Sequence, residues 1–133
     1  VDRVAGPALG QLIAQGVVPV MAPLTHDGQG NLLNTNADTI AGETAKAMAH
    51  LYDVSLVYCF EKRGVLTNPD DDNSVIPEIH ADNFAKLVED GVVSGGMIHK
   101  IQNALQAVEA GVKRVIITAA KGLDTESGTK ILP

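Results

Sequence analysis

The sequence is poor in aromatic residues and cysteine, and it has no long apolar stretch. Aromatic residues make up 3% of the 133 residues, Trp is absent, and Cys59 is the one cysteine. A single cysteine excludes an internal disulfide and favours a reducing compartment, so we expect a cytoplasmic protein. Because no run of about 18 apolar residues occurs, we expect no membrane partner, and the start does not resemble a secretory signal.

Positive charge is also scarce. Ten Lys and Arg residues stand against 16 Asp and Glu residues, which gives a net charge of -6 and a pI near 5.0. A nucleic-acid-binding surface needs clustered Lys and Arg, so we expect no nucleic-acid partner. With 45% hydrophobic residues and almost no aromatic ones, the core must be built from Val, Ile, Leu and Ala. That composition suits parallel strands covered by helices.

The length of the chain fits one domain, spanning residues 1–133. The first residue is Val1 rather than Met, and the opening "VDRVAGPALGQLIAQG" already has a helical pattern. We therefore expect this chain to begin inside a longer protein.

Helical patterns alternate with aliphatic runs along the chain. Periodic apolar positions and closing glycines predict helices over 6–16, 40–52, 81–91 and from Gly96 to Gly111. Strand-type runs cover 17–24, 54–60 and 112–118, although Pro19 weakens the first. Turn chemistry covers 25–31, and 67–74 reads as a loop. The alternation predicts an α/β fold with a mostly parallel sheet covered by helices.

Loops that connect strands to helices are the candidate ligand sites, because ligands of open α/β sheets bind at the carboxyl ends of strands. Three loops qualify, with the sequences "NLLNTNAD" (31–38), "FEKRGVL" (60–66) and "SGGMIHK" (94–100).

The loop "SGGMIHK" places Gly95 and Gly96 at the start of a predicted helix, with Lys100 about one turn inside. Helix N-termini present unpaired N–H groups, and glycine lets a phosphate approach them closely. Helical side chains lean toward the N-terminus, so Lys100 could reach an anion held there. A plain turn with a solvated lysine fits the spacing equally well.

The stretch "NTNAD" places Asn34, Asn36 and Asp38 two residues apart, just before a predicted helix. On an extended segment these three side chains would share a face and could enter one cleft. The spacing favours the simpler interpretation, in which Asn36 or Asp38 caps a helix that begins near Thr39.

The other candidates are weaker. Four histidines are scattered without ligand spacing, so we expect no metal held by protein side chains. The acidic run Asp70–Asp72 is typical of a solvated loop, and Cys59, within an apolar run, is predicted to be a small core residue. Three charged residues follow a strand-type run, and the sequence favours contact with a ligand and simple solvation of the loop equally: Glu61, Lys62 and Arg63.

Together, "NTNADTIAGETAKAM", an aliphatic strand with "GVL", "EDGVVSGGMIHKIQNALQAVEAGVKRVIIT" and "GTKI" resemble the N-acetylglutamate kinases of the amino acid kinase family. The resemblance covers 16–131 and corresponds to the carboxyl-terminal half of that family's domain. It implies the nucleotide-binding part of a three-layer α/β sandwich, without the amino-terminal substrate and phosphate-clamp part. We therefore expect this piece to be catalytically inactive alone.

The resemblance also implies an activity, which is ATP-dependent phosphorylation of the side-chain carboxylate of N-acetyl-L-glutamate in arginine biosynthesis. Mg²⁺ would be bound through the phosphates, and the intact enzyme would be a homo-oligomer. Lys100 would stabilise charge on the transferring phosphoryl group, Asp38 would organise the catalytic lysines, and Asn34 and Asn36 would bind the acylated substrate. Twelve residues would line the nucleotide: Glu61, Lys62, Arg63, Gly64, Val65, Leu66, Val92, Val93, Ser94, Gly95, Gly96 and Met97.

Two positions depart from the family's pattern, in which the nucleotide strand ends in Ser or Thr followed by Asp. This sequence has Phe60 and Glu61 there, so we expect the base or ribose contacts to differ. The alternatives are N-succinylglutamate or another substrate of the family and, from a different class, a nucleotide or amino-acid sensing module. The joint presence of Asp38 and Lys100 disfavours the sensing module.

Overall fold

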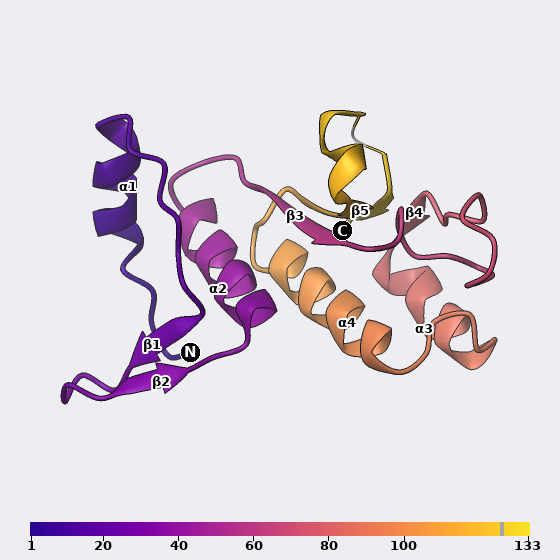
Figure 1. The fold of residues 1–133 in the computed structure, drawn as a ribbon, viewed down its shortest axis with the longest axis horizontal. Helices are drawn as coiled ribbons and strands as arrows, with labels where there is room; N and C mark the ends of the chain where they lie inside the picture. The colour runs from indigo at the N-terminus through magenta and orange to yellow at the C-terminus, as the bar shows by residue number, and fades with distance from the viewer. Residues whose placement is uncertain (126) are drawn as a thin grey trace.

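The computed structural model describes residues 1–125 and 127–133. Figure 1 shows helices packed along a small twisted sheet, with a separate hairpin near the amino terminus. The helices are α1 (Gly6–Ala14), α2 (Ala37–Ala49), α3 (Ala81–Glu89), α4 (Gly96–Glu109) and the 3-10 helix η1 (Ala120–Thr125). The strands are β1 (Leu24–His26), β2 (Leu32–Asn34), β3 (Ser55–Phe60), β4 (Glu78–Ile79), β5 (Arg114–Ala119) and β6 (Thr129–Ile131).

The larger sheet has the strand order β3-β5-β6-β4. β3 runs parallel to β5, in a register from Ser55 opposite Arg114 to Phe60 opposite Ala119, and β4 runs parallel to β6. The pair β5 and β6 is antiparallel. Two of the three pairings are thus parallel, which confirms the predicted α/β class and mostly parallel sheet. β4 and β6, two and three residues long, were not predicted because such short strands leave no periodic pattern.

The core lies between this sheet and the helices. α2 and α4 pack against each other and against β3 and β5, while η1 lies on the opposite side of the sheet (Figure 1). Ile79, Ile101, Val115 and Ile131 are completely buried. Burying one such side chain contributes about 1.5–3 kcal/mol. The periodic apolar positions that predict α4 include Ile101, Leu105 and Val108, which are buried, and Met97, which is half-buried.

β3 is buried on one face only. Its side chains alternate, so that Tyr58 is buried and Leu56 and Phe60 are half-buried against the helices, while the opposite face is exposed. Cys59 lies on the exposed face, so the prediction that it is a core residue is wrong. A continuous apolar run predicts burial on both faces, but the helices cover only the face of β3 that carries Leu56, Tyr58 and Phe60.

The predicted strand over 17–24 is also wrong, because β1 begins only at Leu24. Pro19 and Pro23 have no N–H group to donate to a neighbouring strand. Val18 and Val20 are 83% and 95% exposed, so this apolar segment is not part of the core.

Residues 27–31 of the predicted turn 25–31 join β1 and β2 into an antiparallel hairpin, whereas Thr25 and His26 belong to β1. The Asp27 carboxylate accepts hydrogen bonds from the side-chain amide of Asn31 at 2.6 Å and the main-chain N–H of Gln29 at 2.7 Å. These bonds lower the pKa of Asp27 below its usual value.

Among the described residues, no helix combines the length and the apolar content that crossing a membrane requires.

Candidate functional site

Three segments that are distant in the sequence meet at the carboxyl end of β3. Asp38 lies in the first turn of α2, Phe60 is the last residue of β3, and Lys100 lies about one turn inside α4. The Lys100 Nζ is 3.4 Å from Asp38 Oδ2 and 3.7 Å from the centroid of the Phe60 ring. The side chains of Lys100 and Asp38 are 34% and 31% exposed, so the ion pair is open to solvent on one side.

The start of α2 is fixed by Asn36. Its side-chain oxygen accepts a hydrogen bond from the main-chain N–H of Thr39 at 3.1 Å, and its backbone is extended. The predicted helix cap is therefore confirmed. Because α2 begins at Ala37, Asp38 is helical and does not follow one extended segment with Asn34 and Asn36. Asn34, at the end of β2, is exposed.

Tyr58 connects the start of α2 to the sheet. Its hydroxyl donates a hydrogen bond to the main-chain carbonyl of Asp38 at 3.1 Å. Burial, together with the negative charge of Asp38, raises the pKa of Tyr58 to about 12. The Tyr58 ring also stacks on the Phe60 ring, with centroids 6.1 Å apart and an interplanar angle of 18°.

The start of α4 is open. Gly95 has φ +57°, a conformation that favours glycine, and it precedes the first residue of the helix. A Cβ added to Gly95 or Gly96 would meet no other atom of the described residues within 4 Å. Ser94, Gly95 and Gly96 are all exposed, whereas the N–H groups of Met97 and Ile98 already donate to the carbonyl oxygens of Ser94 and Gly95, at 3.3 Å and 3.2 Å. An anion could approach the exposed backbone of Gly95 and Gly96, with Lys100 one turn further along.

The predicted nucleotide segments divide into open and buried parts. Glu61, Lys62 and Arg63 are exposed, whereas Gly64, Val65 and Leu66 are buried. The N–H of Val65 donates to the hydroxyl of Thr129 at 2.8 Å. In the second segment Val93 is buried, and Val92 and Met97 are half-buried. The surface available to a ligand is therefore limited mainly to Glu61–Arg63 and Ser94–Gly96.

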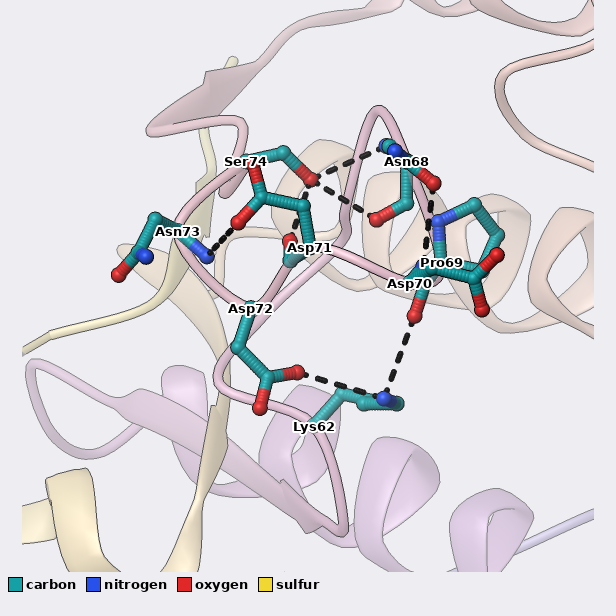
Figure 2. A network of polar contacts seen from close by, with 8 residues as sticks. All are labelled: Lys62, Asn68, Pro69, Asp70, Asp71, Asp72, Asn73 and Ser74. Atoms are coloured by element: carbon teal, nitrogen blue, oxygen red, sulfur yellow. Dashed lines mark hydrogen bonds and ion pairs between the residues drawn. The ribbon is translucent and has the colours of Figure 1, made fainter.

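The loop over 67–74, which follows the first nucleotide segment, has a polar network of its own. Figure 2 shows Lys62 turned toward it, with Nζ 3.3 Å from both Asp72 Oδ1 and the carbonyl oxygen of Pro69. The Ser74 hydroxyl lies 2.9 Å and 2.7 Å from the carbonyl oxygens of Asn68 and Asp71. The acidic run is exposed, as predicted. Within 1–125 and 127–133, no three His, Cys, Asp or Glu side chains are grouped as metal ligands.

Sequence reasoning missed the contacts of Tyr58, Phe60 and Thr129. The first two could have been placed from the two-residue period of the strand, which puts Leu56, Tyr58 and Phe60 on one face. No sequence pattern places Thr129 next to Val65, because they belong to segments that the fold alone brings together.

Comparison with known sequences gives relatives over almost the whole chain. Residues 1–119 match the amino acid kinase family. An acetylglutamate kinase from Bacteroides fragilis is 59% identical over 131 residues, covering 98% of this chain and 50% of that protein. An acetylglutamate kinase from Bacteroides thetaiotaomicron is 60% identical, covering 98% of this chain and 51% of that protein. The chain thus spans about half the length of these curated relatives.

Solved structures share the fold. An N-acetylglutamate synthase from Neisseria gonorrhoeae, complexed with coenzyme A and N-acetyl-glutamate, superposes with a TM-score of 0.83. It is 24% identical, and the match covers 99% of this chain and 31% of that one. A carbamate kinase from Giardia lamblia bound to AMP-PNP superposes with a TM-score of 0.68 at 20% identity, covering 99% of this chain and 50% of that one.

Proposed function

Because this chain belongs to the amino acid kinase family, we propose that it is part of an acetylglutamate kinase. The reaction is ATP-dependent phosphorylation of the side-chain carboxylate of N-acetyl-L-glutamate, a step of arginine biosynthesis, in a cytoplasmic homo-oligomer. The identity with two proteins named acetylglutamate kinase supports this substrate. At the site, the observation that carries the proposal is the 3.4 Å pair of Asp38 and Lys100 beside the open start of α4.

The chemistry requires little more than positioned charge. Phosphoryl transfer depends on in-line placement and on cations near the spreading negative charge. ATP, when bound, supplies the phosphoryl group, with Mg²⁺ on its phosphates. The acceptor carboxylate is already ionised, so it needs no general base. Its repulsion from the phosphates must be offset, and in this proposal the ammonium group of Lys100 does so.

The residues have separate roles in this proposal. Lys100 contacts the transferring phosphoryl group, and Asp38 holds the lysine through the ion pair. Gly95 and Gly96 leave the helix N-terminus accessible to phosphate. The side-chain oxygen of Asn36 is used by the helix cap, so its NH₂ group and the exposed Asn34 remain for the substrate.

The nucleotide lies along the open rim of Glu61–Arg63, Val92, Ser94 and the two glycines, with Met97 at its edge. Val65, Leu66 and Val93 support this rim from the core, where their side chains are buried. Because the chain spans half the length of its relatives, we expect the 133-residue piece alone to give no turnover.

The test is a kinetic comparison in the intact protein that contains this segment. Acyl phosphate is trapped with hydroxylamine, using N-acetylglutamate and N-succinylglutamate as substrates. Lys100→Ala should lower kcat by about 100- to 1,000-fold, because its contact is strongest in the transition state. KM should change by no more than about threefold.

A matched control is Lys113→Ala. Lys113 pairs with Asp53 at 3.7 Å but is 64% exposed and belongs to another part of the surface. Its replacement should leave kcat unchanged. An unchanged kcat for Lys100→Ala would remove Lys100 from the chemistry. Turnover of N-succinylglutamate alone would change the substrate, and nucleotide binding without acyl phosphate would favour a sensing module.

A further inference from the structure

Phe60 makes a contact with Lys100 that the proposed roles do not use. The Nζ of Lys100 lies 3.7 Å from the centroid of the Phe60 ring, well inside the limit of about 6 Å for a cation–π interaction. Asp38 contacts the same nitrogen at 3.4 Å from another element. The ammonium group is therefore held between α2 and β3 while its own side chain comes from α4.

A lysine needs such support if it is to act at a fixed point. Its ammonium group is carried on a flexible four-carbon stem, and an ion pair about one-third exposed to solvent holds it weakly. A second carboxylate would hold Lys100 more firmly but would compete with a phosphate for its charge. An aromatic face orients the ammonium group and leaves its N–H donors available to an anion.

The ring of Phe60 is itself fixed by its neighbours. Phe60 is paired in register with Ala119 of β5, and its ring stacks on that of Tyr58. The Tyr58 hydroxyl in turn donates to the carbonyl of Asp38. Tyr58 therefore connects both groups that contact Lys100, one through its ring and one through its hydroxyl.

From this arrangement we propose that Phe60 is a positioning residue, whose ring holds the Lys100 ammonium group at the open start of α4. The proposal rests on the proposed function for its kinetic consequence, but the contact itself can be tested without it. Phe60 acts through Lys100 and contributes no group to the substrate.

The kinetic test compares Phe60→Leu, which removes the aromatic face, with Phe60→Tyr, which keeps it, in the intact protein. Phe60→Leu should lower kcat by about threefold to thirtyfold, with KM for ATP unchanged, and Phe60→Tyr should stay within about twofold. In the Lys100→Met background, Phe60→Leu should have no further effect on kcat. A merely structural role would lower kcat in both backgrounds, and that result would overturn the proposal.

The second test does not depend on the reaction. In an NMR spectrum of the intact protein, the ring current of Phe60 should shift the Lys100 ε-methylene signals upfield of the other lysines. Phe60→Leu should abolish this shift and Phe60→Tyr should keep it. If Phe60→Leu does not fold, the contact is tested by the upfield shift of the Lys100 signals in the wild-type protein and by its retention in Phe60→Tyr. Unshifted Lys100 signals in the wild-type protein would overturn the contact. Shifted signals in a wild-type protein that does not phosphorylate N-acetylglutamate would overturn only the proposed function.

Discussion

The two parts of the chain, residues 1–36 and residues 37–133, differ in how far their apolar side chains are buried. Among the described residues, every buried hydrophobic side chain lies in the second part, beginning at Ala45. Ten of the fourteen exposed large hydrophobic residues lie in the first part: Val1, Leu12, Ile13, Val17, Val18, Val20, Met21, Leu24, Leu32 and Leu33. The first part therefore has helical and hairpin structure without a core of its own.

The difference indicates which residues have a rigid support. Asp38, Phe60 and Lys100 are attached to α2, β3 and α4, which enclose the core. Asn34 belongs to a hairpin with no buried side chain. The first part contacts the second through α1, where a Cβ added to Gly6 would lie 3.4 Å from the carbonyl oxygen of Ala47. We therefore expect the stability of the chain to depend on the second part.

The largest effect should come from a core side chain of the second part. Ile101 is completely buried, so Ile101→Ala removes apolar contacts and leaves a cavity. We expect the free energy of unfolding of the 133-residue chain to fall by about 2–5 kcal/mol. The matched variant of the first part is Val20→Ala, at a residue that is 95% exposed. It should change the free energy of unfolding by less than about 0.5 kcal/mol. Chemical denaturation measures both, and equal losses would contradict the difference between the parts.

Two glycines with positive φ, one in each part of the chain, allow a second comparison of stability. At Gly128 φ is +125°, and an added Cβ would clash with the carbonyl oxygen of Ile117 and lie 2.9 Å from Thr118 Cβ. Gly128→Ala should therefore lower the free energy of unfolding by about 2–4 kcal/mol. Gly28, in the hairpin turn, has φ +78° and open space around it. Gly28→Ala should cost about 1 kcal/mol from backbone strain alone. Thermal unfolding of the two variants would contradict this if Gly28→Ala were the more damaging.

Local patterns predicted much of the second part. The stripe through Ile101, Leu105 and Val108 identified α4, and the closing Gly91 and Gly111 marked the ends of two helices. Asn36 or Asp38 was predicted as a cap from its position before the helix, and the structure has Asn36 in this role, in a bond that spans only three residues. Such features depend on neighbours in the sequence, so the sequence contains the information that determines them.

The remaining features depend on partners far away in the chain. Apolar composition predicted a strand over 17–24, but a strand requires an adjacent strand, and Val18 and Val20 have none. The exposure of Cys59 depends on which face of β3 the helices cover, because Tyr58 and Phe60 pack toward them and Cys59 lies on the opposite face. The approach of Phe60 to Lys100 requires the final placement of β3 against α4. Sequence resemblance suggested roles for Asp38 and Lys100, but only the fold shows their 3.4 Å contact.

Among the variants of the second part, Tyr58→Phe should have the smallest effect at neutral pH. Tyr58→Phe removes the hydrogen bond to the Asp38 carbonyl and should lower the free energy of unfolding by about 1 kcal/mol. The difference between the two proteins should change with pH, because the pKa of Tyr58 rises from 10.0 to about 12 on folding.

The sign of this change follows from which state keeps its proton. Between pH 10 and pH 12 the unfolded tyrosine ionises while the folded one, with a pKa of about 12, remains neutral, so ionisation favours unfolding. The contribution of Tyr58 is thus complete below its unfolded pKa and is lost as pH rises through the folded value. In denaturation midpoints measured from about pH 8 to pH 12, the advantage of the wild-type protein over Tyr58→Phe should shrink above pH 10 and then reverse, since phenylalanine has no proton to lose. Parallel curves would mean that folding does not protect the Tyr58 hydroxyl from ionisation, contrary to its burial and its hydrogen bond to the start of α2.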